Sequence, residues 1–118
     1  MNRPRFLADN DLNDSILAGV LRRVPSVMFV RVRDVGFGIA TDDDVFAYAQ
    51  RMSLCVVSHD VNTMPAAAVR VTASGLSFPG LFVIRQSTPL ATAIDSLVLV
   101  WSASRHEEWR DLVVFLPF

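Results

Sequence analysis

Lysine is absent from this chain, and cysteine is almost absent. All 11 basic residues are arginine, and 10 of the 12 acidic residues are aspartate. The one cysteine, Cys55, has no second thiol with which to form an internal disulfide. Because it lies in the apolar run Leu54-Cys55-Val56-Val57, we expect a buried structural thiol.

Long apolar runs and a strong net charge are also missing. No apolar segment approaches the roughly 18 residues that a membrane-spanning helix needs. The first residues show no signal-peptide pattern. We therefore expect a cytoplasmic protein that makes no membrane contact. The formal net charge of −1 and the pI near 6.0 argue against binding to nucleic acid through charge alone.

With 118 residues, the chain has room for a single domain, 1–118. Five apolar segments have the pattern of β-strands, at 6–8, 27–32, 54–57, 81–84 and 112–116. Four segments have the pattern of amphipathic helices, at about 16–24, 42–52, 65–74 and 89–101. This alternation predicts an α/β domain with a mostly parallel five-stranded sheet flanked by helices on both faces.

Local signals mark several boundaries of these elements. Thr41 and Asp44 have the spacing of a short capping box at the start of the second helix. The segment 34–40, with two glycines, is expected to be a loop. Pro89 is expected in the first turn of the fourth helix, after a cap at Ser87 or Thr88.

Acidic residues follow the predicted strands at places that the fold would bring to one edge. Asp9 follows the first strand, Asp60 follows the third, and Asp42–Asp44 open the second helix. Right-handed crossovers put these loops at the carboxyl ends of the strands, where open α/β sheets bind ligands. Clustered carboxylates repel one another until a proton or a cation relieves them, and Mg²⁺ or Mn²⁺ prefers oxygen ligands. The pattern predicts a metal site for phosphodiester hydrolysis by activated water.

Ordinary structural roles compete with this interpretation. Asp42–Asp44 suit a helix N-terminus through capping and the helix dipole alone. Asp9 and Asp11 are residue types common at helix starts, and Asp60 suits a turn. Only the joint placement of these residues at one edge favours the metal site.

Several segments resemble a family of short bacterial PIN-like proteins. Phe6-Leu7-Ala8-Asp9 resembles the family's opening strand and Asp-Glu-Asn triplet, and 33–45 resembles its Arg-Asp-x-Gly and Ala-Ser-Asp-Glu-Glu-Ile stretch. The most specific match is Val57-Ser58-His59-Asp60-Val61-Asn62-Thr63-Met64, which is close to the Thr-His-Asp-Val-Asn-Thr-Met signature of one branch. Further matches to that branch are Pro79-Gly80-Leu81-Phe82-Val83, Pro89 with Ala93-Ile94, and Leu116-Pro117.

The resemblance implies a three-layer PIN-like fold and a metal-dependent ribonuclease, often the toxin of a toxin–antitoxin pair. By motif position, Asp9, Asp42 and Asp60 would bind Mg²⁺ or Mn²⁺. Asn62 stands where many PIN proteins have a fourth acidic residue. RNA would be the substrate, and a small DNA-binding antitoxin would be a protein partner.

Neighbouring polar residues are candidates for supporting roles. Asn10 and Asp11 reverse the acid and amide of the family's Glu-Asn pair, so Asp11 would take part of the missing glutamate's place. Asp43 adjoins the helix-start acids, and His59 is a candidate proton shuttle or phosphate contact, although a structural hydrogen bond is the commoner role of such a histidine.

Two arginines and two tryptophans complete the set of candidates. Arg33 and Arg85, near the ends of the second and fourth strands, could bind an RNA phosphate or pair with surface aspartates. Trp101 or Trp109 could lie on the face of a homodimer. The alternative is that both tryptophans belong to the core, which we favour for Trp101.

Two other functions fit parts of the pattern. A phospho-receiver domain also has acids after its first and third strands, but it needs a lysine that this chain lacks. A PIN-like domain without catalysis could act as a binding module for a protein partner. The neutral side chain of Asn62 is consistent with that alternative.

Overall fold

The computed structural model describes residues 2–35 and 41–118. Its five strands are β1 (Phe6–Ala8), β2 (Phe29–Arg31), β3 (Cys55–Ser58), β4 (Leu81–Ile84) and β5 (Val113–Leu116). Its α-helices are α1 (Asp14–Arg23), α2 (Asp42–Met52), α3 (Thr63–Ala73) and α4 (Leu90–Ala103). Two short 3-10 helices, η1 (Val32–Asp34) and η2 (His106–Trp109), follow β2 and α4.

All five strands pair in parallel, in the order β2-β1-β3-β4-β5. The central strands β1, β3 and β4 are buried along their whole length. Strands covered on both faces need apolar side chains on both faces, which explains their continuous apolar runs. The predicted α/β sheet is confirmed, and it is wholly parallel.

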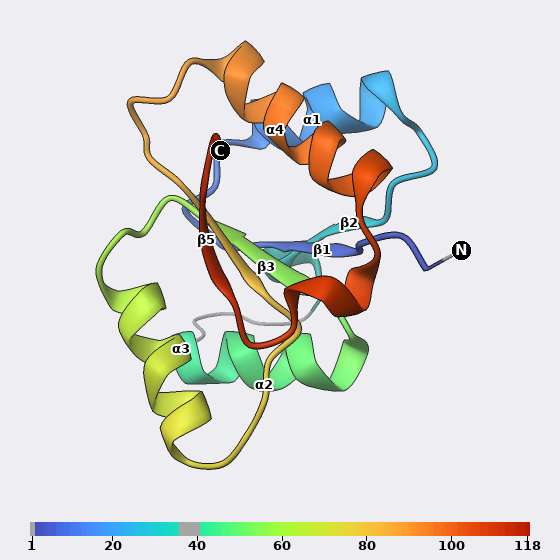
Figure 1. Ribbon diagram of the computed structural model, residues 1–118. Helices are drawn as coiled ribbons and strands as arrows, with labels where there is room; N and C mark the ends of the chain where they lie inside the picture. The colour runs from blue at the N-terminus through green and yellow to red at the C-terminus, as the bar shows by residue number, and fades with distance from the viewer. Residues whose placement is uncertain (1, 36–40) are drawn as a thin grey trace.

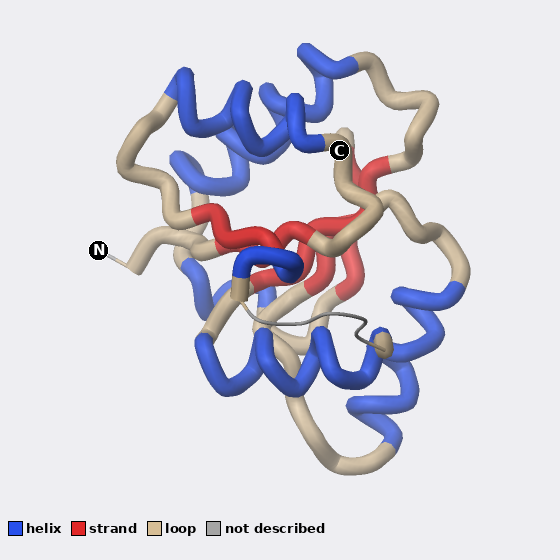
Figure 2. The backbone as a smooth tube through the Cα atoms, turned by 180° about the vertical axis from the view of Figure 1, so that it is seen from behind, coloured by secondary structure: helices blue, strands red, loops and turns tan. Residues whose placement is uncertain are grey.

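Helices cover the two faces of the sheet in pairs and make a three-layer domain. Figure 1 shows α1 and α4 on one face and α2 and α3 on the other, and Figure 2 shows the same layers from behind. Alternation along β1 divides the core, because Phe6 and Ala8 pack towards α1 and α4 while Leu7 packs towards α2 and α3.

The strand order reverses between β1 and β3. The chain runs from β1 outward to β2, and it then returns through α2 to place β3 on the other side of β1. The loops after β1 and β3 therefore leave the carboxyl edge of the sheet towards opposite faces, β1 leading to α1 and β3 to α3. Such a switch point is the common ligand site of doubly wound sheets.

Some boundaries differ from the sequence-based expectation. β2 is shorter than predicted because Val32 begins η1, and α3 starts at Thr63, two residues before Pro65. Pro89 lies at the N-cap of α4 and not in its first turn, and no side chain caps this helix. The capping box of Thr41 and Asp44 is confirmed. Of the expected loop, 36–40 lies outside the described residues.

The predicted buried thiol is also confirmed. Cys55 is fully buried, and burial raises the pKa of its thiol to about 12, so the sulfur stays protonated. Trp101 and Trp109 are both half-buried against the core on the α1–α4 face. No helix in the described residues has the length and apolar character needed to cross a bilayer.

Substitution of Gly19 tests the packing of α1 on α4. A Cβ at Gly19 would lie 2.2 Å from Cδ1 and 2.9 Å from Cγ1 of Ile94. We expect Gly19→Ala to lower the free energy of unfolding by about 1–2 kcal/mol, because overpacking outweighs the better helix propensity of alanine. Urea denaturation measures this. In an Ile94→Val background, which lacks Cδ1, the same substitution should cost less. A stabilising Gly19→Ala in the wild-type background would contradict the close approach.

Candidate functional site

The hydroxyl of Ser58 joins the ends of β1 and β3 at the switch point. Ser58 is buried, and its Oγ donates to Asp9 Oδ2 at 2.9 Å and lies 3.3 Å from Asp11 Oδ1. The same oxygen accepts the backbone N–H of Asp60 at 3.0 Å. A hydroxyl has one proton, so it serves one of the two carboxylates at a time, and Asp9 is the nearer. The Ser58 side chain thus links the loop after β1 to the loop after β3 through hydrogen bonds.

Asp9 is the most electrostatically strained of the acidic residues. Its carboxylate is half-buried, and Oδ1 accepts the N–H of Asn10 at 2.9 Å. The pKa of Asp9 is raised to about 6, chiefly by burial and also by the negative charges of Asp11 and Asp42, while the hydrogen bonds from Ser58 and Asn10 oppose the shift. Near neutral pH the carboxylate is ionised at a cost in free energy.

The three aspartates that open α2 have three different environments. Asp44 accepts the N–H of Thr41 and completes the capping box. Asp43 is exposed and forms an ion pair with Arg70 of α3 at 3.0 Å. Asp42 is half-buried, and its charge acts on Asp9. The structure therefore brings Asp42 to the acidic edge and takes Asp43 and Asp44 into other contacts.

Asp60 stabilises the start of α3. Its Oδ1 accepts the N–H groups of Asn62 and Thr63, both at 2.8 Å, and its Oδ2 accepts the Thr63 hydroxyl. Burial would raise the pKa of Asp60, but these hydrogen bonds outweigh it and hold the pKa below its usual value. Asp60 stays ionised, with part of its acceptor capacity used. The side chain of Asn62 is exposed.

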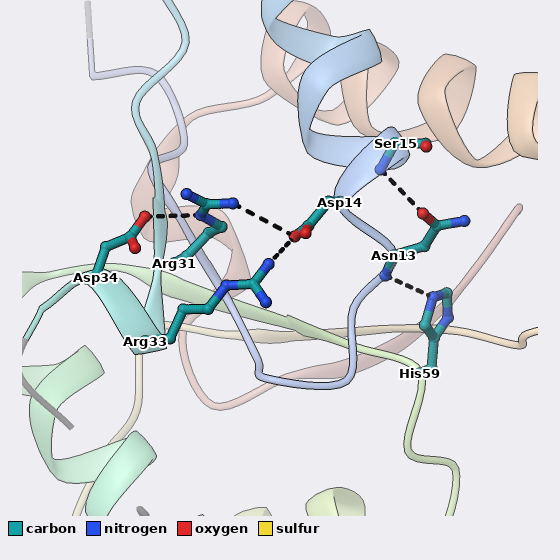
Figure 3. A network of polar contacts seen from close by, with 7 residues as sticks. All are labelled: Asn13, Asp14, Ser15, Arg31, Arg33, Asp34 and His59. Atoms are coloured by element: carbon teal, nitrogen blue, oxygen red, sulfur yellow. Dashed lines mark hydrogen bonds and ion pairs between the residues drawn. The ribbon is translucent and has the colours of Figure 1, made fainter. Parts of the chain in front are cut away.

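His59 connects three loops through both nitrogens of its ring. Nδ1 lies 2.7 Å from the carbonyl oxygen of Ile84, and Nε2 accepts the N–H of Asn13 at 3.2 Å (Figure 3). These partners assign the proton to Nδ1 of a neutral ring. A role for His59 as a proton shuttle would require one of these bonds to break.

The two candidate arginines have different partners. Arg33 contacts Asp14, which also lies 3.7 Å from Arg31, and Arg31 binds Asp34 at 2.7 Å (Figure 3). Arg85 lies over the ring of Phe115, 4.9 Å from its centroid, and has no carboxylate partner in the described part of the chain. The charge of Arg33 is thus compensated, while that of Arg85 is not.

A polar groove of about 280 Å³ adjoins the acidic residues. It is lined by Asp11, Asn13, Ile16, His59, Gln86, Thr88 and Leu90. Nothing in the sequence marks Gln86 or Thr88 as a functional residue, because polar residues are common in loops. The sequence predicts Thr88 only as a possible helix cap. A larger groove of about 430 Å³ lies elsewhere, between α2 and α3 beside Asp43 and Arg70.

Within residues 2–35 and 41–118, no group of three or more His, Cys, Asp or Glu side chains is arranged to hold a metal ion. Mg²⁺ usually takes only one or two protein carboxylates and completes its shell with water and phosphate. The oxygen donors of Asp9, Asp11 and Asp42 suit that chemistry. Comparison with protein-family models, curated proteins and solved structures found no match for this chain.

Removal of the charge at Asp9 should make the protein more stable near neutral pH. The folded pKa is raised, so the stabilisation linked to protonation of Asp9 is complete below about pH 4 and is lost as the pH rises through about 6. We expect Asp9→Asn to raise the free energy of unfolding by about 1–2 kcal/mol at about pH 7.5 and by much less at about pH 5. Urea unfolding at both pH values checks this, with Asp43→Asn as the control. A destabilisation that is the same at both pH values would show that hydrogen bonds, not charge, dominate the contribution of Asp9.

Proposed function

We propose that this protein is a metal-dependent, PIN-like ribonuclease. The single observation that supports this is the pair of carboxylates, Asp9 and Asp11, that meet at Ser58 Oγ where β1 and β3 end, with the charge of Asp42 near enough to act on Asp9. The fold holds Asp9 half-buried against two like charges. An ionised Asp9 in this environment lowers the stability of the fold, so a role for its charge in function is the simplest reason for the arrangement.

The residues present fit a hard divalent cation. Each donor is a carboxylate oxygen, the ligand type that Mg²⁺ and Mn²⁺ prefer. A cation among these carboxylates would turn their mutual repulsion into attraction. Asp9 and Asp42 are the proposed metal-binding residues, and Asp11 is added to the set on the geometry around Ser58.

A metal bound there would lower the pKa of a water molecule and stabilise negative charge on the phosphoryl oxygens. Ser58 orients the carboxylate of Asp9 through its hydrogen bond. Asp60, ionised and fixed at the start of α3, adds negative charge beside the site and has lone pairs left for a ligand. Arg85 is the proposed contact for an RNA phosphate, and Arg33 could join it only by leaving Asp14.

A PIN-like binding module without catalysis is the second candidate. The observation that favours it is the use of both Asp60 oxygens by the start of α3, next to the neutral Asn62. Such a module would act through a protein partner, of which a small DNA-binding antitoxin is the candidate. A phospho-receiver domain shares the strand order found here. The chain contains no lysine to contact a phosphoryl group.

The nuclease hypothesis predicts metal-dependent cleavage that depends on particular aspartates. We expect the purified protein to cut labelled single-stranded RNA with Mn²⁺ or Mg²⁺ and to stop when chelator is added. Asp9→Asn and Asp42→Asn should each lower the cleavage rate by at least about tenfold to 100-fold, because replacing even a residue that only supports a metal ligand costs that much. Asp60→Asn should lower it as well. Mn²⁺ should raise the melting temperature of the wild type more than that of Asp9→Asn.

The neighbouring residue Asp43 provides the matched control. Asp43→Asn removes the same charge one residue from Asp42, but it does so in the ion pair with Arg70. It should keep the cleavage rate within about twofold of wild type, since an exposed ion pair contributes little. Equal rates for the wild type, Asp9→Asn, Asp42→Asn and Asp60→Asn in the presence of metal would refute the nuclease hypothesis and favour the binding module.

A further inference from the structure

The polar groove beside the acidic residues is lined mainly by uncharged side chains, although it adjoins the proposed metal site. It lies between the loop after β1 and the loop after β4, where α1 and α4 begin. Asp11 borders both the groove and the Ser58 hydrogen bonds. None of the described residues that line it is an arginine, so an anionic group has no cationic partner among them. The groove therefore suits an uncharged ligand that is attached to whatever occupies the acidic site.

The side chains of the groove offer unused hydrogen-bonding groups. Within the described residues, no hydrogen bond involves the side chain of Gln86 or Thr88. Asn13 uses its Oδ1 to accept the N–H of Ser15, and its amide N–H groups have no partner among residues 2–35 and 41–118. Together these groups supply both donors and acceptors at one surface.

Two apolar side chains, Ile16 and Leu90, complete the lining. Ile16 is buried, whereas Leu90 is 45% exposed, so part of the apolar wall is open to a ligand. A flat group with a hydrogen-bonding edge and an apolar face matches this combination. A nucleobase has that chemistry, and single-stranded RNA presents its bases unpaired.

We propose that this groove binds one unpaired nucleobase of an RNA strand. The inference rests on the proposed ribonuclease function, since it puts the base next to the phosphate that the acidic residues would act on. The volume of about 280 Å³ is just under the lower end of small-molecule pockets, which is consistent with one nucleoside and not with a longer segment.

His59 holds the walls of the groove in place before any ligand binds. Its Nε2 bond to the Asn13 N–H fixes the loop after β1, and its Nδ1 bond to the Ile84 carbonyl fixes the end of β4. Gln86 and Thr88 lie two and four residues after Ile84, and a turn closed by the bond from the Thr88 N–H to the Arg85 carbonyl at 3.0 Å orders that loop. His59 is thus a positioning residue, and a preformed groove lowers the entropic cost of binding.

Nucleoside binding without metal tests this proposal separately from catalysis. Backbone amide chemical shifts are recorded as adenosine, guanosine, cytidine or uridine is titrated to about 10 mM, a weak-binding range for single small ligands. We expect at least one nucleoside to shift the amides of Asn13, His59, Gln86 and Thr88, and ribose 5-phosphate to leave them unchanged. Gln86→Ala and Thr88→Ala should each weaken that binding by about threefold to tenfold, as expected for one lost hydrogen bond. Ser87→Ala, exposed and outside the lining, should not.

The outcomes separate this inference from the ribonuclease proposal. Metal-dependent cleavage without a nucleoside response at these amides would overturn the groove assignment and leave the nuclease standing. A nucleoside response that Gln86→Ala and Thr88→Ala leave unchanged would also overturn it. A response to a short peptide in place of all four nucleosides would assign the groove to a protein ligand. Selective nucleoside binding in a protein that cuts no RNA would support the groove and reject the nuclease.

Discussion

The parallel pairing of β1 with β3 is the constraint on which the candidate site depends. Ala8 lies opposite Val57 in that pairing, and the Asp9 N–H continues it by donating to the Val57 carbonyl at 2.9 Å. The register therefore puts Asp9 and Ser58 side by side at the point where the strands end. Because the two loops then leave towards opposite faces of the sheet, the carboxylates are held at an open edge and not packed into the core.

The acidic side chains at this edge are of two kinds: some accept N–H groups at helix starts, and others have few compensating partners. Asp44 and Asp60 accept N–H groups at the starts of α2 and α3, where negative charge is favoured by the orphan donors and the helix dipole. Asp9 receives less compensation, and burial raises the free energy of its ionised form. The N–H groups at a helix start account for the carboxylates that accept them. A half-buried carboxylate with like charges nearby is relieved either by a proton or by a cation. That contrast, more than the number of aspartates, is the reason for assigning the proposed metal site to Asp9 and its neighbours.

Local patterns in the sequence predicted the features that depend on neighbouring residues. Continuous apolar runs identified the sheet, and Thr41 with Asp44 identified the start of α2. The roles of Asp43 and His59 depended on partners far along the chain, Arg70 and Ile84, which no local pattern encodes. The motif ranked Asp60 above Asp11, whereas the geometry sets Asp11 beside Asp9. Only tertiary contacts distinguish a helix cap from a metal-binding carboxylate at equal spacing.

The arginine pairing limits how the proposed RNA substrate could be recognised. The chain is nearly neutral overall, and Arg33 is already compensated by Asp14 next to the acidic edge. Long-range attraction of a polyanion is therefore weak, and the carboxylates themselves repel phosphate until a cation is bound. Under these conditions the contacts that select a substrate must be short-range. The proposed cation at the carboxylates and the proposed base contacts in the adjoining groove would meet that requirement, since neither depends on a basic surface.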